Sequence, residues 1–225
     1  MRQELTHAVE DYLKTIYDLT QSEGRASTSR IAAVLGITPA SVSGMLKKLA
    51  AASPPLLQYQ RHRGVVLTPE GEKIALEVIR HHRLLELFLV EALGYGWDEV
   101  DAEADRLEHV ISEEFEARIT EVLGDPTHDP HGDPIPSPDL EMPAHATLCL
   151  RDLRPPQGGT IRRVRDGDPA LLRYLESLGV VPQAVFTVVA YEPFDGNLTL
   201  RLEGNAQSVV LGPRVTQQIF VECND

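Results

Sequence analysis

The sequence predicts an α+β fold, with helices over the first part of the chain and short strands over the last. Three observations predict it. Apolar residues recur every three or four positions through much of 5–123, which indicates amphipathic helices. Regular patterns stop over 124–145, which holds six of the 16 prolines. From 147 onward, short apolar-rich runs interrupted by one helical stretch at 168–179 predict a small β-barrel.

These patterns divide the chain of 225 residues into three expected domains, 1–75, 76–145 (with the proline-rich linker) and 146–225. The formal net charge is −13, but it is unevenly spread. The first domain holds nine Lys/Arg against seven Asp/Glu, the second four against eighteen, and the third eight against nine. The acidity therefore lies in the middle, and the first domain can present a basic face to phosphates.

Several classes of protein are excluded by what the sequence lacks. It has no apolar run of about 18 residues, so no membrane span is expected. Its N-terminus carries early acids and is unlike a signal peptide. Cys149 and Cys223 form no CxxC pair, which argues against a disulfide framework or a thiolate zinc site and favours the cytoplasm. An enzyme is the least expected class, because no P-loop, GxSxG or GxGxxG motif occurs.

Residues 28–67 have the pattern of a winged helix-turn-helix. A short helix over 28–35 is followed by a turn at Gly36 and a second helix over 38–52. Thr38 is suited to cap that helix and Pro39 to occupy its first position. A basic hairpin then follows as the wing. The alternative is a small helical bundle with solvated lysines.

The second helix would present small polar residues to base edges, with lysines and wing arginines near phosphates. The expected DNA-contacting residues are Thr38, Pro39, Ala40, Ser41, Ser43, Lys47, Lys48, Arg61 and Arg63.

A group of carboxylates and histidines gathers on the following helices. Asp105, Glu108 and His109 stand at i, i+3 and i+4 of an expected helix over 97–123, which puts them on one face. Oxygen and imidazole ligands suit Mn²⁺ or Fe²⁺ and offer no soft sulfur. The alternative is a solvated acidic face. The other candidate ligands are Asp11, His82, Glu86 and Asp101.

The remaining histidines favour simpler interpretations. His81 is expected to be exposed beside His82, and His7 to precede the first helix. His128, His131 and His145 lie in the proline-rich stretch, where packing of the loop is expected rather than metal ligation.

Six stretches resemble the diphtheria-toxin-repressor family of iron- and manganese-dependent transcription regulators. They are EDYLKTIYDL (10–19), IAAVLGITPASVSGMLKKL (31–49), VVLTPEGEKIA (65–75), HHRLLELFL (81–89), AEADRLEHVIS (102–112) and DPHGDPIP (129–136). The part after 147 resembles the SH3-like third domain of that family in its length and in its pattern of short apolar-rich runs.

The resemblance implies a homodimer that binds Mn²⁺ or Fe²⁺ and then a palindromic operator in double-stranded DNA. Asp11 and Asp105 are carboxylates, as in the manganese type of this family, whereas Lys14 stands where that type has another carboxylate. Asp166 or Asp168 could supply a third-domain ligand. The implied primary ligands are Asp11, Asp105, Glu108 and His109, and the implied ancillary ligands are His82, Glu86 and Asp101.

The expected function is metal-dependent repression of metal uptake genes when metal is plentiful. Two alternatives stay open. One is a winged-helix regulator that senses a non-metal ligand, which metal-independent DNA affinity would favour. The other is a cytosolic metal-binding protein, which salt-sensitive duplex binding would exclude.

Overall fold

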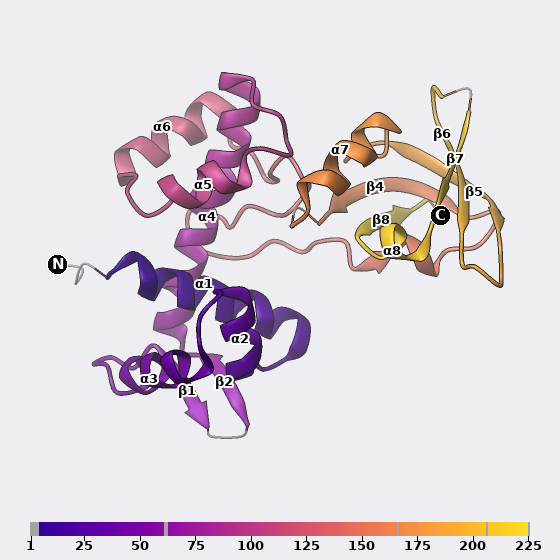
Figure 1. The fold of residues 1–225 in the computed structure, drawn as a ribbon. Helices are drawn as coiled ribbons and strands as arrows, with labels where there is room; N and C mark the ends of the chain where they lie inside the picture. Colours follow the sequence, from indigo (N-terminus) through magenta and orange to yellow (C-terminus); the bar gives the residue numbers. More distant parts are fainter. Residues whose placement is uncertain (1–4, 61–62, 166, 206, 225) are drawn as a thin grey trace. The chain divides into compact units, whose positions relative to one another are not determined.

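The computed structural model describes residues 5–60, 63–165, 167–205 and 207–224 and divides into two compact units (Figure 1). The first unit contains residues 1–81, 108–111 and 136–142, and the second contains 82–107, 112–135 and 143–225. Within the described ranges, no single helix is both long and apolar enough to cross a membrane; one sharply bent helix pair meets that test by length and composition only.

The first unit contains the predicted winged helix-turn-helix, which is confirmed. Helix α1 (His7–Glu23) is followed by α2 (Thr28–Val34) and α3 (Pro39–Ala50). The wing is the antiparallel pair β1 (Leu57–Gln60) and β2 (Gly64–Leu67). The caps are those that the sequence predicts, because the Thr38 side chain accepts from the Ser41 N–H and Pro39 is the first residue of α3.

One apolar core holds these elements together. Leu13, Ile16, Ile31, Val42 and Leu46 are fully buried in it. Each such side chain contributes about 1.5–3 kcal/mol by leaving water. The orientation of α2 and α3, and therefore of the surface of α3, depends on this packing against α1.

The helices that follow differ from the sequence prediction in one respect. Helix α4 (Pro69–Leu93) runs unbroken, as expected. The single helix expected over 97–123 is wrong: α5 (Asp101–Leu107) ends before Glu108, and α6 (Glu113–Leu123) begins afresh. The physical reason is a new N-cap, since the Ser112 side chain accepts from the Phe115 N–H and three glutamates follow in the first turn.

The C-terminal part of the second unit is a six-stranded antiparallel sheet, in the order β3-β8-β4-β5-β6-β7. Leu150, Ile161, Phe186 and Leu200 lie in its core. The small β domain predicted from the sequence is confirmed. Its elements are β3 (Leu148–Cys149), η1 (Leu150–Asp152), β4 (Gly158–Val164), α7 (Pro169–Ser177), β5 (Val185–Tyr191), β6 (Leu198–Leu202), β7 (Ser208–Leu211), α8 (Pro213–Thr216) and β8 (Ile219–Cys223).

Part of the proline-rich stretch docks on this sheet as a folded loop. The Val164 N–H at the end of β4 donates to the His131 carbonyl. Gly132 lies so close to the backbone of Arg162 that a Cβ there would overlap its carbonyl oxygen. Only glycine fits this contact, and its φ of +89° also favours glycine. The loop therefore has a fixed position on β4.

Candidate metal centre and DNA-binding face

Three of the four predicted primary ligands lie together in the first unit. Asp11, Glu108 and His109 each offer a ligand atom, and these atoms all lie within 4.8 Å of one another. His109 Nε2 is 2.8 Å from Asp11 Oδ1 and 3.4 Å from Glu108 Oε1. Helix α1 supplies Asp11, and the turn after α5 supplies the other two.

Glu10 holds the His109 ring from its other side, a role that sequence reasoning missed. Its Oε2 is 2.7 Å from His109 Nδ1, and the His7 ring stacks on the imidazole at 4.8 Å between centroids. Hydrogen bonding to Asp11 is the largest cause that raises the pKa of His109. A carboxylate on the second ring nitrogen is one of the usual partners of a metal-ligating histidine.

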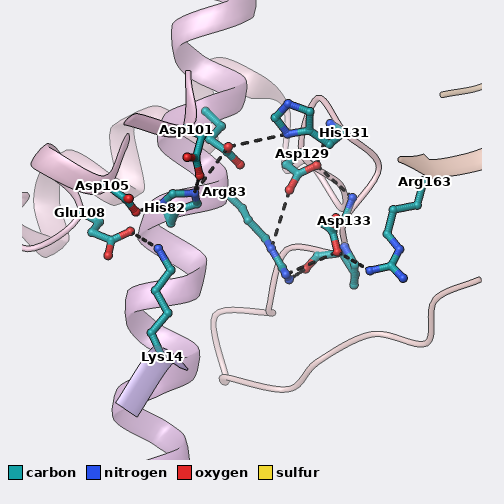
Figure 2. Close-up of polar contacts among 12 residues, drawn as sticks. Lys14, His82, Arg83, Asp101, Asp105, Glu108, Asp129, His131, Asp133 and Arg163 are labelled. Atoms are coloured by element: carbon teal, nitrogen blue, oxygen red, sulfur yellow. Dashed lines mark hydrogen bonds and ion pairs between the residues drawn. The ribbon is translucent and has the colours of Figure 1, made fainter. Parts of the chain in front are cut away.

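Glu108 is enclosed by further contacts. Its side chain is 1% exposed, and its Oε2 accepts from Lys14 Nζ at 2.7 Å (Figure 2). The expectation that His81 is exposed is wrong. That side chain is buried and its Nδ1 lies 3.0 Å from the Glu108 carbonyl oxygen, because residue 81 faces the 108–111 segment within this unit.

The predicted ancillary residues come together in the second unit. His82 Nε2 lies 3.4 Å from Glu86 Oε1 and 3.5 Å from Asp101 Oδ1. Asp105, the fourth predicted primary ligand, belongs to this unit and lies 3.3 Å from His82 Nδ1. His82 and Glu86 stand at i and i+4 on α4, and α5 supplies Asp101 and Asp105.

A second buried group, absent from the sequence prediction, shares Glu86. The ligand atoms of Glu86, Asp129 and His131 lie within 4.8 Å of one another, and all three residues are buried. His131 Nε2 is fixed 2.7 Å from the Trp97 carbonyl oxygen, so Nδ1 faces Glu86 at 3.7 Å. Across the described ranges, His131 Nδ1, Asp129 Oδ2 and both Glu86 oxygens have no hydrogen-bond partner.

Arginines border this group on one side. Arg83 Nε lies 3.7 Å from Asp129 Oδ2, and its NH2 group lies 3.6 Å from Asp133 Oδ1. Asp133 also accepts from Arg163 of β4 at 2.9 Å (Figure 2). Burial, followed by the negative charge of Glu86, holds the pKa of Asp129 well above its ordinary value.

The donor sets fit a divalent cation such as Mn²⁺ or Fe²⁺. Both groups offer only carboxylate oxygen and imidazole nitrogen, which suit these ions better than ions that prefer sulfur. In the first unit, Glu10 orients the imidazole as ligation requires. In the second, buried acceptors without donors indicate atoms that need a proton or a cation.

Helix α3 presents the predicted DNA-contacting residues at its surface. Thr38, Pro39, Ala40, Ser41, Lys47 and Lys48 are exposed, and Ser43 is half-buried. In the wing, Arg63 is exposed, whereas Arg61 lies outside the described residues. The third-domain candidate Asp168 instead caps α7, where it accepts from the Ala170 N–H. The other candidate, Asp166, is likewise outside the described residues.

Known proteins match the chain along almost its whole length. Residues 4–65 match "Iron dependent repressor, N-terminal DNA binding domain", 68–137 match "Iron dependent repressor, metal binding and dimerisation domain", and 148–223 match "FeoA domain". The iron-dependent repressor IdeR of Mycobacterium tuberculosis (strain ATCC 25618 / H37Rv) is 33% identical over 231 residues, covering 97% of this chain and 98% of IdeR. The chain belongs to the iron-dependent repressor family.

Other relatives within this family support the assignment. The diphtheria toxin repressor of Corynebacterium efficiens is 37% identical over 162 residues, which cover 71% of this chain and 70% of that protein. A solved manganese-dependent transcriptional repressor in complex with manganese is 39% identical, with a TM-score of 0.87, covering 95% of this chain and 98% of that one. ScaR with bound Zn²⁺ is 33% identical, with a TM-score of 0.78 and coverage of 95% and 98%. The resemblance predicted from the sequence is confirmed.

Proposed function

We propose that this protein is a Mn²⁺- or Fe²⁺-dependent DNA-binding transcriptional regulator that represses metal uptake genes when metal is plentiful. It acts as a homodimer on a palindromic operator in the cytoplasm, and it is not an enzyme. Its expected domains are 1–75 for DNA, 76–145 for metal and dimerisation, and 146–225 as the FeoA-like domain. The family match and the metal dependence named for its relatives support this proposal.

One observation carries the metal part of the proposal, namely the convergence of Asp11, Glu108 and His109 from two distant segments. Asp11 lies on α1, whose packing also positions α2 and α3. The two other ligands lie nearly 100 residues away in sequence. On the sequence resemblance alone, we keep Asp105 as the fourth primary ligand.

The second unit offers a further cation position centred on Glu86. The ancillary set His82, Glu86 and Asp101 is one choice of ligands, and Glu86 with Asp129 and His131 is the other. The unpartnered atoms of the second set support it, because a bound cation would satisfy buried acceptors that otherwise cost about 1–3 kcal/mol each.

The mechanism follows from what these side chains join. A bound divalent cation would supply the positive charge that the clustered carboxylates need. Asp11 would then tie α1 to the 108–111 segment, and Glu10 would keep the His109 ring in the orientation for ligation. Because α1 packs against α2 and α3, fixing it restricts the recognition helix α3 to fewer orientations. Metal shifts the population toward the DNA-binding state only if it binds that state more tightly.

Asp105→Ala tests this proposal most directly. Fluorescence anisotropy on duplex DNA from upstream of the protein's own gene and neighbouring metal-transport genes would be recorded with chelator, with Mn²⁺ and with Fe²⁺ under anaerobic conditions. We expect wild-type binding only with metal, and loss of that dependence in Asp105→Ala. Glu99→Ala, an exposed acid before α5, is the matched control. Full metal-dependent affinity in Asp105→Ala would show that Asp105 is not a ligand of this centre, and the same result in Asp11→Ala would refute the mechanism.

The same titration separates the rival functions. Equal DNA binding with chelator and with metal would favour a winged-helix regulator that senses another ligand. Metal binding without salt-sensitive duplex binding would favour a metal-binding protein that does not act on DNA.

A further inference from the structure

Gly44 lies in the interior of α3, where packing within the chain does not require a glycine. Glycine is among the least favourable residues inside a helix, because its backbone loses the most freedom on folding. As far as the described residues extend, a Cβ at Gly44 would meet nothing within 4 Å beyond its own helix backbone and chain neighbours. Gly71 of α4 differs, because a Cβ there would overlap the Leu56 carbonyl oxygen. Packing therefore explains Gly71 but does not explain Gly44.

The surface of α3 around Gly44 carries short side chains on one side and lysines on the other. Ala40 and Ser41 precede Gly44 by four and three residues, so they lie next to it on the helix surface. Lys47 and Lys48 follow it by three and four residues and lie on its other side. All five residues are exposed. This face therefore runs from a methyl and a hydroxyl group, across bare backbone at Gly44, to two ammonium groups.

The hydroxyl groups near Gly44 form hydrogen bonds within the first turns of α3. Ser43 Oγ donates to the Pro39 carbonyl oxygen at 2.9 Å. Thr38 Oγ1 accepts from the Ser41 N–H and lies 3.0 Å from Ser41 Oγ. These contacts keep short side chains close to the helix backbone, and none of them fills the space beside Gly44.

Duplex DNA is the ligand expected on this face. Residues 4–65 match a DNA-binding domain, and in a helix-turn-helix the second helix, here α3, enters the major groove. The groove is about 12 Å wide, and a helix with its side chains is about 10–12 Å across. Each side chain on the facing surface therefore sets how closely the helix backbone approaches the base edges. A glycine at position 44 permits the closest approach.

We propose that Gly44 is a specificity-determining residue, because its missing side chain lets α3 enter the groove deeply enough for Ala40 and Ser41 to contact base edges. The proposal rests on the proposed DNA-binding function and names how the recognition helix selects sequence. Ala40 reads by apolar contact, which favours the methyl group of thymine. Lys47 and Lys48 contact phosphates, which adds affinity but carries no sequence information. Sequence preference thus depends on the space at Gly44, and overall affinity depends on the lysines.

Three variants of the full-length chain separate these roles. Gly44→Ala adds one methyl group to the face, and Lys47→Ala removes one phosphate contact. Gly167→Ala is the matched control, because Gly167 is also exposed with nothing within 4 Å of an added Cβ but lies in the small β domain. Thermal unfolding first shows that each variant folds. We expect Gly44→Ala to raise the unfolding midpoint by about 2–4 °C, since alanine is favoured over glycine in a helix.

DNA binding is then measured by fluorescence anisotropy in the presence of Mn²⁺. The wild type first selects a preferred duplex from a pool with a randomised central segment, and a scrambled duplex of the same composition is the non-specific probe. We expect Gly44→Ala to bind the selected duplex on the order of tenfold more weakly, as for the loss of one base contact, and the scrambled duplex as the wild type does. Lys47→Ala should weaken binding to both duplexes and reduce the salt dependence by about one phosphate contact. Gly167→Ala should match the wild type on both.

Three results would overturn the proposal. Two are an unchanged affinity of Gly44→Ala for the selected duplex and an equal loss on both duplexes. The third is a Gly44→Ala variant that is less stable than the wild type or does not fold, because packing within the chain would then explain the glycine. Failure of the proposed function looks different, because the wild type itself would then select no duplex in Mn²⁺.

Discussion

The carboxylate–histidine groups of the two units offer the same kinds of ligand atom but differ in how fully their carboxylates are paired. In the first unit, Asp11 and Glu108 each face a nitrogen partner, the imidazole of His109 or the ammonium of Lys14. In the second, both oxygens of Glu86 and one of Asp129 have no hydrogen-bond partner among the described residues. The carboxylates of the first group are partly offset by nitrogen partners, whereas the second group holds buried carboxyl oxygens that lack hydrogen-bond partners.

The difference teaches what each group needs in order to be stable. The first can fold without metal, because built-in cations offset the carboxylates until a metal ion replaces part of their role. The second must take up a proton or a cation, as the raised pKa of Asp129 already indicates. We therefore expect removal of metal to affect the stability of the second unit more than that of the first.

The largest effect is expected from Arg83→Met in the second unit. Arg83 faces Asp129 and Asp133, and its removal would leave both carboxylates without that counter-charge. Breaking such a buried ionic contact costs about 3–5 kcal/mol. Urea unfolding in the presence of chelator measures the change. Arg118→Met, which breaks an exposed pair with Glu121, should cost less than about 1 kcal/mol. Equal losses in the two variants would show that the acidic group does not depend on Arg83.

A smaller effect, on metal affinity, is expected from Glu10→Gln in the first unit. The variant weakens the carboxylate contact to His109 Nδ1 without removing a proposed ligand. Loss of such an orienting partner lowers metal affinity by about 10- to 100-fold. Equilibrium dialysis with Mn²⁺ would record it, with Glu23→Gln on the same helix as control. Unchanged affinity would mean that the imidazole is held by other contacts.

Asp129→Asn should change how the stability of the second unit depends on pH. Because its folded pKa is raised, the stability linked to protonated Asp129 is fully present below its ordinary pKa of 3.8. That stability is lost as pH rises through the folded pKa. Asparagine keeps the oxygen that accepts from the His131 and Asp133 N–H groups but cannot ionise.

Without metal, the variant should therefore become more stable than the wild type as pH rises. The expected difference in the free energy of unfolding is about 1–2 kcal/mol, because one unsatisfied buried acceptor is removed. Chemical unfolding at several pH values between 4 and 8 measures this gain. A difference that stays constant with pH would contradict the raised pKa.

The smallest effect is expected from Ser112→Ala, which removes the cap of α6 without touching either group. The loss of the hydrogen bond from the Phe115 N–H should cost about 1 kcal/mol. Thermal unfolding should show this cost, while Mn²⁺ affinity stays unchanged. Reduced Mn²⁺ affinity would show that α6 positions His109.

The sequence predicted contacts within one element far better than contacts between elements. Periodicity and caps identified α1 to α4, the wing and the small β domain. The i, i+4 pair His82 and Glu86 followed from helix spacing, and Asp11 was a candidate ligand from the sequence before the resemblance made it a primary one. The break before Ser112 was missed, because the apolar and acidic pattern continues across it.

Asp129 and His131 were missed for a different reason. They lie in a proline-rich loop without periodicity, and their position depends on Gly132 meeting the backbone of β4. A sequence pattern gives no sign of such a tertiary contact. His81 and His82 show the same limit, since nothing in two adjacent histidines reveals that each serves a different unit.

The consecutive histidines on α4 make contacts in different units, so the rotation of this helix about its axis matters to both. His81 meets the Glu108 backbone in one unit, and His82 meets Glu86 and Asp101 in the other. Neighbouring residues of an α-helix point about 100° apart. Inserting or deleting one residue between Pro69 and His81 would turn His81 away from the Glu108 backbone within the first unit. A single change in length would thus misalign the helix for one unit while leaving the contacts of the other intact.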